Sequence, residues 1–400
     1  MPAFVFPGQG AQRPGMGTPW LDHPSWEVVE EASVAAGRDI GRLLTDADEE
    51  ELTETRNAQV ATFTFSLLVL DAVERLGIEP TRLAGHSVGE YTALAAAGSL
   101  GFEESFRLVA ERGEAMQGAA DANPGVMSVI SGCDADLVDI ACRLADGNVW
   151  VANFNSPEET VIAGDTESVE RATSLALDLG ARRAFPVRVG GAFHTPFMAP
   201  ARNRLRKILA TTTFHDPDTP IVSNVDSRFH TVGEDWKVLL SAQLCSPIRW
   251  HQSIMRLAGL DDPNLEVERC FVELGPGDSL SAMIRHTLPT ATTVTVITPS
   301  DLDSLVEAIT GDSALHAYAV DHQGESLYVS ERVVISPAAG IFEPAEDGPQ
   351  AGDRIEVGTP LGRVAGQDVL APFSGTLKGG LAQSGERVQA GQPIVWLHTA

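Results

Sequence analysis

The chain has 400 residues, and at about 150 residues per domain this length predicts two or three domains. Its 28 Lys and Arg residues against 55 Asp and Glu residues give a formal net charge of −27. Nucleic acid is therefore not expected as a partner, because phosphate backbones are bound by clustered cationic side chains.

No uninterrupted apolar run approaches the roughly 18 residues that a membrane-spanning helix needs. The N-terminus lacks the basic region and apolar stretch of a secretion signal, so no membrane partner is expected. The four cysteines lie far apart without C-x-x-C spacing, which argues against a metal site or a disulfide framework. A reducing, cytoplasmic setting is the simplest interpretation. The cysteines are Cys133, Cys142, Cys245 and Cys270.

From residue 1 to about 310, short β-branched runs alternate with longer helical patterns, which is typical of an α/β fold. The first strand is predicted at residues 3–6. Residues 58–76 are apolar almost all round, which indicates a helix buried between a sheet and other helices. A short strand at 82–86 then leads through a turn at Ser87 into a helix, and a further helix is predicted at 102–117.

Residues 121–189 interrupt this pattern with short strands around two helices, at 134–145 and 166–179. Their order predicts a compact β-α-β-β-α-β insert. The main domain therefore comprises residues 1–120 and 190–310. Residues 311–326 are polar without strong periodicity, which predicts a linker.

The last segment, residues 327–400, contains an internal repeat. Residues 352–364 read GDRIEVGTPLGRV, and residues 385–397 read GERVQAGQPIVWL. A related phrase precedes each copy, at 336–341 and at 371–376. Two copies of a strand-turn-strand unit predict a small β-sandwich with approximate two-fold symmetry.

The segment Gly85–Gly89 matches the pattern G-x-S-x-G, in which the glycines permit a tight turn from a strand into a helix and hold the serine hydroxyl exposed. The predicted strand and helix supply the context that the pattern requires. The N–H of Val88 then lies at a helix start, where the dipole favours an oxyanion. Ser87 is therefore the candidate nucleophile, and a serine in an ordinary helix-entry turn is the alternative.

A serine nucleophile needs a base that accepts its proton. Among the ten histidines, His194 is the first choice, because it lies in a glycine-rich turn after a predicted strand. Arg112 lies between Leu108 and Met116 at i±4, among apolar neighbours on the predicted helix 102–117. It could pair with a substrate carboxylate or form a structural ion pair, and spacing alone leaves both open.

Seven segments in this order resemble the motifs of malonyl-CoA:acyl carrier protein transacylases, over about 300 residues. The resemblance implies an α/β-hydrolase-like core with a ferredoxin-like insert, and a Ser-His dyad in place of a triad. The segments are Phe6–Gln12, Gly85–Tyr91, Glu111–Gly113, Ala152–Pro157, Gly191–His194, Gln243–Trp250 and Glu273–Gly277.

Carried over to this sequence, the resemblance implies that Ser87 accepts the acyl group and that His194 is its general base. Gln243 would orient His194 through its backbone carbonyl. The backbone N–H groups of Gln9 and Val88 would form the oxyanion hole.

The resemblance also implies that Arg112 binds the malonyl carboxylate and that Phe193 fills the space an α-methyl branch would occupy. A bidentate arginine selects a free carboxylate and fixes the thioester carbonyl near the serine. Phe193 is also open to a plain packing role. The implied reaction moves malonyl from malonyl-CoA to the phosphopantetheine thiol of acyl carrier protein for fatty acid synthesis, without a metal or other cofactor.

Acyl carrier proteins are normally acidic, so a net charge of −27 should hinder docking unless a basic patch is present. Two basic clusters could supply one, and a solvated helix face is the alternative interpretation. The clusters are Arg182, Arg183 and Arg188, and Arg202, Arg204, Arg206 and Lys207.

Three alternatives stay open. A polyketide pathway uses similar transacylases. A serine esterase or thioesterase shares G-x-S-x-G but usually needs an acid for its histidine, for which Asp165 or Asp178 is available. A non-enzymatic scaffold in which the C-terminal domain is the functional part is disfavoured. The reason is that four candidate site residues occur together: Ser87, His194, Arg112 and Gln243.

The repeat in residues 327–400 resembles biotinyl/lipoyl carrier domains, which are flattened barrel-sandwich all-β structures. In that family a lysine lies on the hairpin that joins the two halves. Here the corresponding residues, 364–370, contain no lysine, and Lys378 lies outside that hairpin. We therefore expect neither biotin nor lipoate, and the partner or intramolecular contact of this domain is left unassigned.

Overall fold

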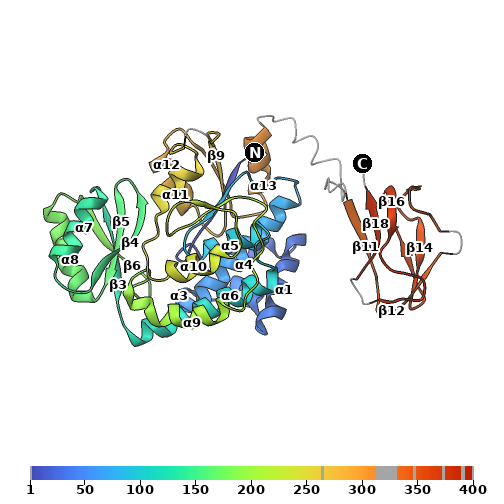
Figure 1. The fold of residues 1–400 in the computed structure, drawn as a ribbon, viewed down its shortest axis with the longest axis horizontal. Helices are drawn as coiled ribbons and strands as arrows, with labels where there is room; N and C mark the ends of the chain where they lie inside the picture. Colours follow the sequence, from blue (N-terminus) through green and yellow to red (C-terminus); the bar gives the residue numbers. More distant parts are fainter. Residues whose placement is uncertain are drawn as a thin grey trace. The chain divides into compact units, whose positions relative to one another are not determined.

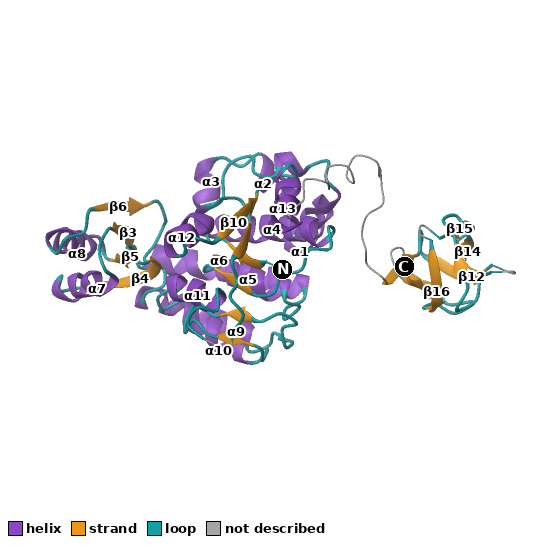
Figure 2. Cartoon of the chain, turned by 90° about the horizontal axis from the view of Figure 1, so that it is seen from above, coloured by secondary structure: helices purple, strands orange, loops and turns teal. Residues whose placement is uncertain are grey.

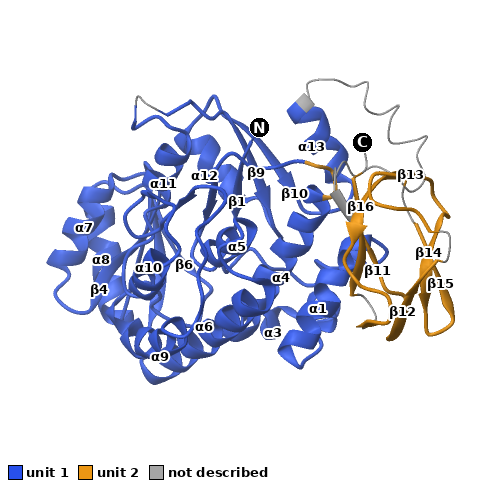
Figure 3. Ribbon diagram, turned by 45° about the vertical axis from the view of Figure 1, so that its right-hand side comes forward, with its two compact units in different colours: residues 1–74, 78–321 blue, residues 75–77, 322–400 orange. Residues whose placement is uncertain are grey.

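A computed structural model of the chain describes residues 2–262, 265–310, 331–345, 348–371, 374–388 and 392–398. The chain forms two compact units, Met1–Glu74 with Ile78–Asp321 and Arg75–Gly77 with His322–Ala400 (Figure 3). The boundary between the two units falls within the predicted linker, residues 311–326, which lies outside the described residues.

The first unit is built on a six-stranded sheet with the order β10-β9-β1-β2-β7-β8. Figure 1 labels strand β9 of this sheet and the helices around it. Its first five strands are parallel, and β8 is antiparallel to β7. A largely parallel sheet is covered on both faces, and all residues of β1 and β2 are buried. The α/β fold predicted from the sequence is therefore confirmed. The strands are β1 (Ala3–Phe6), β2 (Leu83–Gly85), β7 (Ile221–Val222), β8 (Phe229–His230), β9 (Cys270–Leu274) and β10 (Thr292–Val296).

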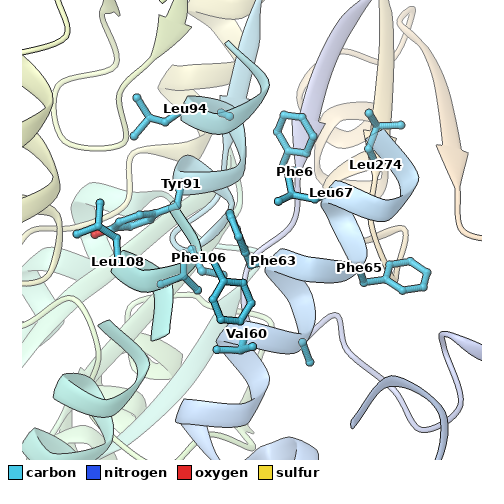
Figure 4. Packing of buried hydrophobic residues seen from close by; sticks show 14 of the residues in the cluster. Phe6, Val60, Phe63, Phe65, Leu67, Tyr91, Leu94, Phe106, Leu108 and Leu274 are labelled. Atoms are coloured by element: carbon cyan, nitrogen blue, oxygen red, sulfur yellow. The ribbon is translucent and has the colours of Figure 1, made fainter. Parts of the chain in front are cut away.

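Two long helices, α4 (Thr55–Glu74) and α6 (Phe102–Ala122), pack beside this sheet and against each other. Almost every side chain of α4 is buried, as its apolar composition predicts. Figure 4 shows Phe63 of α4 and Phe106 of α6 among the buried side chains, and their rings meet edge to face with centroids 6.4 Å apart. Both helices also contact α5 (Gly89–Ala96), the helix that follows the candidate nucleophile.

Residues 126–187 form a second, antiparallel sheet with the order β4-β5-β3-β6. Helices α7 (Ala135–Leu144) and α8 (Thr166–Asp178) cover one of its faces (Figure 2). The chain order here is β-α-β-β-α-β, and a separate apolar cluster forms between the helices and the sheet. The strands are β3 (Val126–Ser131), β4 (Val149–Ser156), β5 (Glu159–Gly164) and β6 (Arg183–Val187).

The remaining helices of the first unit surround the main sheet. Among the described residues, no helix has the length and apolar character needed to span a membrane. These helices are η1 (Thr18–Trp20), η2 (Pro24–Trp26), α1 (Glu27–Ala36), α2 (Ile40–Thr45), α3 (Glu49–Thr53), α5 (Gly89–Ala96), η3 (Pro196–Met198), α9 (Ala199–Leu209), α10 (Asp235–Gln243), α11 (Trp250–Leu257), α12 (Ser279–Thr287) and α13 (Asp301–Thr310).

The described part of the second unit is all-β, with two four-stranded sheets of order β11-β18-β16-β13 and β15-β14-β12-β17. An apolar cluster of its own lies between these strands. The strands are β11 (Glu331–Ile335), β12 (Gly340–Pro344), β13 (Arg354–Ile355), β14 (Pro360–Val364), β15 (Gln367–Leu370), β16 (Gly375–Gly380), β17 (Arg387–Val388) and β18 (Pro393–His398).

The repeat in the sequence accounts for this topology. The first copy, residues 352–364, supplies β13 and β14, and the second copy, residues 385–397, supplies β17 and β18. The two sheets are related by this repeat. If β11, β12, β13 and β14 are replaced by β15, β16, β17 and β18, and the reverse, the strand order of one sheet becomes that of the other. Each sheet therefore contains strands from both copies.

Candidate active site

Ser87 occupies the turn between β2 and α5 and has a left-handed backbone, with φ of 55°. The turn is tight because a Cβ at Gly85 would lie 1.9 Å from the carbonyl carbon and oxygen of Gly89. Only glycine fits at this close approach. The G-x-S-x-G pattern thus forms a strained strand-to-helix turn, which a structure retains where the surroundings hold it in place.

His194 lies within reach of the nucleophile. Its Nε2 is 2.9 Å from Ser87 Oγ, and its Nδ1 is 2.9 Å from the main-chain oxygen of Gln243. Because a carbonyl oxygen only accepts hydrogen bonds, Nδ1 carries the ring proton and Nε2 is the acceptor for the serine hydroxyl. His194 also has a left-handed backbone, with φ of 60°.

The imidazole of His194 is held neutral by its surroundings. Burial, assisted by the nearby Arg112 guanidinium, lowers the pKa of His194 to about 3, and the bond to the Gln243 carbonyl acts in the opposite direction. A neutral imidazole can accept a proton, so His194 is suited to act as a general base at neutral pH.

Arg112 is fully buried and contacts the nucleophile directly. Its Nη2 donates to Ser87 Oγ at 3.1 Å and to Gln243 Oε1 at 2.8 Å, while its Nη1 donates to Gln59 Oε1 at 2.7 Å. The ring of Tyr91 lies 5.4 Å from the guanidinium carbon. Among the described residues, its Nε has no hydrogen-bond partner and no carboxylate forms a salt bridge with it. A guanidinium held by neutral groups retains its attraction for a substrate carboxylate.

The other predicted residues lie around the same point. Gln9 and Phe193 line a cavity of about 260 Å³ that Ser87 and His194 also line. Val88 is buried at the N-terminal end of α5, directly after the nucleophile. Phe193 also belongs to the main apolar cluster, so it both packs and lines the cavity.

Three further residues complete the site and received no role from the sequence. Gln59 on α4 holds Arg112. Asn224, after β7, accepts the backbone N–H of Ser87 at 2.8 Å, and Glu90 accepts hydrogen bonds from Asn224 and Gln243. Glu90 lies inside a recognised motif, whereas no local signal distinguishes Asn224 from other polar loop residues.

The predicted basic clusters are partly paired. Arg204 forms a bidentate salt bridge with Glu111, with Nε and Nη2 donating at 2.6 and 3.0 Å, and Arg206 Nε donates to Ser241. Arg182 Nη2 lies 3.5 Å from Glu158 Oε2. In the part of the chain that the structure describes, no group of three or more His, Cys, Asp or Glu residues is arranged to hold a metal.

Comparison with known proteins gives a consistent result. A sequence model of the acyl transferase domain family matches residues 3–320. The malonyl CoA-acyl carrier protein transacylase of Bacillus subtilis is 38% identical over 312 residues, which cover 77% of this chain and 96% of the relative. The Escherichia coli K12 protein of the same name is also 38% identical over 312 residues, covering 76% and 98%.

Solved structures agree. An acyl carrier protein S-malonyltransferase from Vibrio cholerae matches with a TM-score of 0.71 and 36% identity, over 76% of this chain and 99% of its own. A malonyl-transacylase in complex with a type II PKS acyl-carrier protein matches with a TM-score of 0.72 and 34% identity, over 78% and 99%. With the Ser-His pair and the buried arginine in place, the chain belongs to the malonyl CoA-acyl carrier protein transacylase family.

Proposed function

We propose that this chain transfers the malonyl group from malonyl-CoA to the phosphopantetheine thiol of acyl carrier protein and so supplies extender units for fatty acid synthesis. The observation that carries this proposal is the contact between Arg112 and Ser87, because it brings a cation for the malonyl carboxylate against the nucleophile. The names of the relatives support the same substrate and the same acceptor.

The first half-reaction forms a malonyl ester on Ser87. His194 Nε2 takes the hydroxyl proton while Ser87 Oγ attacks the thioester carbonyl, and the backbone N–H groups of Gln9 and Val88 stabilise the oxyanion. The carbon–sulfur bond then breaks, and the leaving CoA sulfur takes the proton back from His194. Arg112 binds the distal carboxylate, which fixes the carbonyl beside Ser87.

The second half-reaction is the reverse with a different thiol. The phosphopantetheine thiol gives its proton to His194 and attacks the malonyl ester, and Ser87 Oγ leaves with that proton. The main-chain oxygen of Gln243 keeps the His194 ring in the same tautomer throughout. Phe193, at the wall of the cavity, excludes an α-methyl branch.

The geometry disfavours a serine hydrolase. In a hydrolase triad a carboxylate accepts the histidine Nδ1–H, whereas here the acceptor is the Gln243 carbonyl. Asp165 instead caps α8, where it accepts the N–H of Ser168 at 2.8 Å. A polyketide pathway remains the alternative acceptor system, because one matched relative binds a type II PKS carrier.

For the second unit we propose a biotinyl/lipoyl-like barrel-sandwich that carries no modification. The hairpin between β14 and β15, its fourth and fifth strands, turns at Ala365 and Gly366, both with positive φ. Neither is lysine, and Lys378 is exposed within β16, away from this turn. The unit is then a binding, docking or stabilising module in a protein that we place in the cytoplasm.

A chase experiment tests the transfer. The Ser87 malonyl ester is formed with malonyl-CoA, freed of excess substrate, and mixed with holo acyl carrier protein or with buffer. We expect malonyl-carrier protein within seconds and a stable ester in buffer. Rapid release of free malonate in buffer, with no carrier product, would establish the hydrolase instead.

A further inference from the structure

Glu90 is a buried carboxylate that takes no part in the proposed reaction steps. It lies in the first turn of α5, three residues after the nucleophile, and is 0% exposed. Burial raises its pKa, against the effect of its hydrogen bonds and of Arg112. Both oxygens nevertheless face N–H donors, so the ionised form is the one that these contacts bind. A carboxyl group at such a position is costly unless its oxygens are bonded.

Both oxygens of Glu90 accept hydrogen bonds from groups that hold the site. Oε1 accepts the backbone N–H of Asn224 at 2.7 Å, and Oε2 accepts Gln243 Nε2 at 2.6 Å. The orientation of the Gln243 amide is determined, because its Oε1 accepts from Arg112, which has donors only. Glu90 therefore joins a loop that follows β7 to the C-terminal end of α10.

The Asn224 side of this connection holds the nucleophile. Asn224 Oδ1 accepts the Ser87 N–H at 2.8 Å, and its Nδ2 donates to the carbonyl of Gly85 at 2.7 Å. These two bonds fix both sides of the strained turn. The position of Asn224 itself depends on its backbone N–H, which Glu90 accepts.

The Gln243 side holds the base. The Gln243 side chain donates to the carbonyl of Ser87 at 2.9 Å as well as to Glu90, and its main-chain oxygen takes the His194 Nδ1–H. A shift of this side chain would move the carbonyl that orients the imidazole. One carboxylate thus bonds to the supports of the nucleophile and of the base.

We propose that Glu90 is a positioning residue that sets the distance between Ser87 Oγ and His194 Nε2 through Asn224 and Gln243. The proposal rests on the proposed function, since it concerns the rate at which Ser87 is acylated. Glu90 does not touch the malonyl group, so its loss should lower kcat and leave substrate binding nearly unchanged. Misplacement by about 1 Å can cost about 100-fold in rate.

The test is Glu90→Gln. The side chain keeps its shape, but one carboxylate oxygen becomes an N–H₂ group. Both partners, the Asn224 N–H and the Gln243 amide, are donors, so the hydrogen bond to one of them is lost. Single-turnover acylation by malonyl-CoA is followed by quenched-flow intact mass, and the adduct stoichiometry counts the active molecules. We expect acylation at saturating malonyl-CoA to slow about 30- to 100-fold, with the half-saturating concentration within about threefold of wild type.

Glu273→Gln is the matched control. Glu273 is also fully buried, and its carboxylate accepts two backbone N–H groups, from Leu280 and Ser281, without contacting Ser87, His194 or their supports. We expect a similar loss of melting temperature and an acylation rate within about twofold of wild type. A rate that falls equally in both variants would show that Glu90 acts only through stability.

Asn224→Ala completes a double-mutant cycle with Glu90→Gln. If Glu90 acts partly through Asn224, its substitution costs clearly less in the Asn224→Ala background, whereas independent effects multiply. Wild-type protein that takes up no malonyl group would refute the proposed function. A malonylated wild type whose Glu90→Gln variant acylates at the same rate would overturn the role of Glu90 alone.

Discussion

Among single residues, His194 is kept by burial in the neutral form that can accept a proton, and the same burial lowers the proton affinity of the ring. The ring is 4% exposed, its Nδ1 proton is held by a carbonyl, and its pKa lies near 3 instead of 6.5. The nearby charge of Arg112 disfavours the imidazolium further. The substrate carboxylate, when bound, offsets this charge and makes proton uptake easier as the reaction proceeds.

The first prediction concerns acid pH. Because folded His194 stays neutral well below pH 6.5, the single-turnover acylation rate should be constant between about pH 7 and pH 5. Over the same range His194 binds a proton in the unfolded chain but not in the folded chain, so this residue lowers the free energy of unfolding as the pH falls. A His194→Gln variant should lose this share of the pH dependence. Quenched-flow acylation and urea melts measure the two effects. An acylation rate that drops tenfold with a midpoint near pH 6.5 would contradict the burial argument.

The residues that carry the chemistry differ in how well the sequence identifies them. Ser87, His194 and Arg112 stand in short patterns or among apolar neighbours, so their chemistry has a local signal. Asn224 lies 137 residues from Ser87 and meets it only because β7 pairs with β2 in parallel. Such a contact follows from the strand order, which a single sequence does not specify.

At the level of helices and strands, the turn after β2 depends on two glycines at which backbone segments approach closely. The first, Gly85, lies against Gly89, and the second, Gly89, lies against Phe6. A Cβ at Gly89 would lie 2.1 Å from the carbonyl oxygen of Phe6, so α5 rests directly on the end of β1. Of the oxyanion donors implied by the family, Gln9 follows β1 and Val88 directly precedes α5. The contact between α5 and β1 thereby sets the spacing of the two donors.

The second prediction tests this contact. Gly89→Ala should destabilise the protein by about 3 kcal/mol, because backbone atoms must move to admit the methyl group. Gly118→Ala is the control, since Gly118 is exposed on α6 with nothing within 4 Å of the added carbon. It should stabilise the protein by about 1 kcal/mol. Equal melting temperatures for the two variants, measured by calorimetry, would contradict the close approach.

The sequence predicts well which segments form helices or strands, but it predicts less well the residues at which they begin and end. β1 occupies residues 3–6 as predicted, but α4 begins at Thr55 in place of residue 58, and α6 continues to Ala122 in place of residue 117. The extension of α6 occurs because Ala119 and Ala120 are buried against neighbouring elements, which compensates for the exposed Gly118. The C-terminal end of α6 is therefore set by tertiary packing and does not follow from the local composition.

At the scale of the whole molecule, the chain joins a transacylase to a β unit that the matched relatives do not cover. The matches to Bacillus subtilis, Escherichia coli and Vibrio cholerae proteins span 76 to 77% of this chain and nearly all of each relative. The second unit has its own apolar cluster and strand pairing. The first unit thus contains every residue of the candidate site.

The third prediction is that the second unit carries no prosthetic group. Full-length protein co-produced with a biotin ligase and with a lipoate ligase should keep its unmodified mass, because the β14–β15 turn offers Ala365 and Gly366 where a carrier domain offers lysine. A carrier domain with an intact lysine serves as the positive control. A biotin or lipoate adduct on the wild type that is lost in Lys378→Arg would overturn the assignment.

The fourth prediction is that the acyl transfer does not require the second unit. A chain that ends at residue 310 should acylate Ser87 and pass malonyl to carrier protein at rates within about twofold of the full chain, because the solved relatives fold without this unit. Steady-state transfer at several carrier concentrations measures this. A loss of transfer with acylation intact would instead place the second unit in carrier docking.

The selection of malonyl groups by Arg112 is tested most directly by intact mass after brief exposure to malonyl-CoA or acetyl-CoA, for wild type, Ser87→Ala and Arg112→Ala. We expect one malonyl group on the wild type, none on Ser87→Ala, and malonylation slowed about 100-fold in Arg112→Ala, because removal of the guanidinium leaves the buried carboxylate unpaired. Acetylation should depend far less on Arg112. Equal rates with malonyl-CoA and acetyl-CoA in the wild type, unaffected by Arg112→Ala, would show that Arg112 does not bind the malonyl carboxylate.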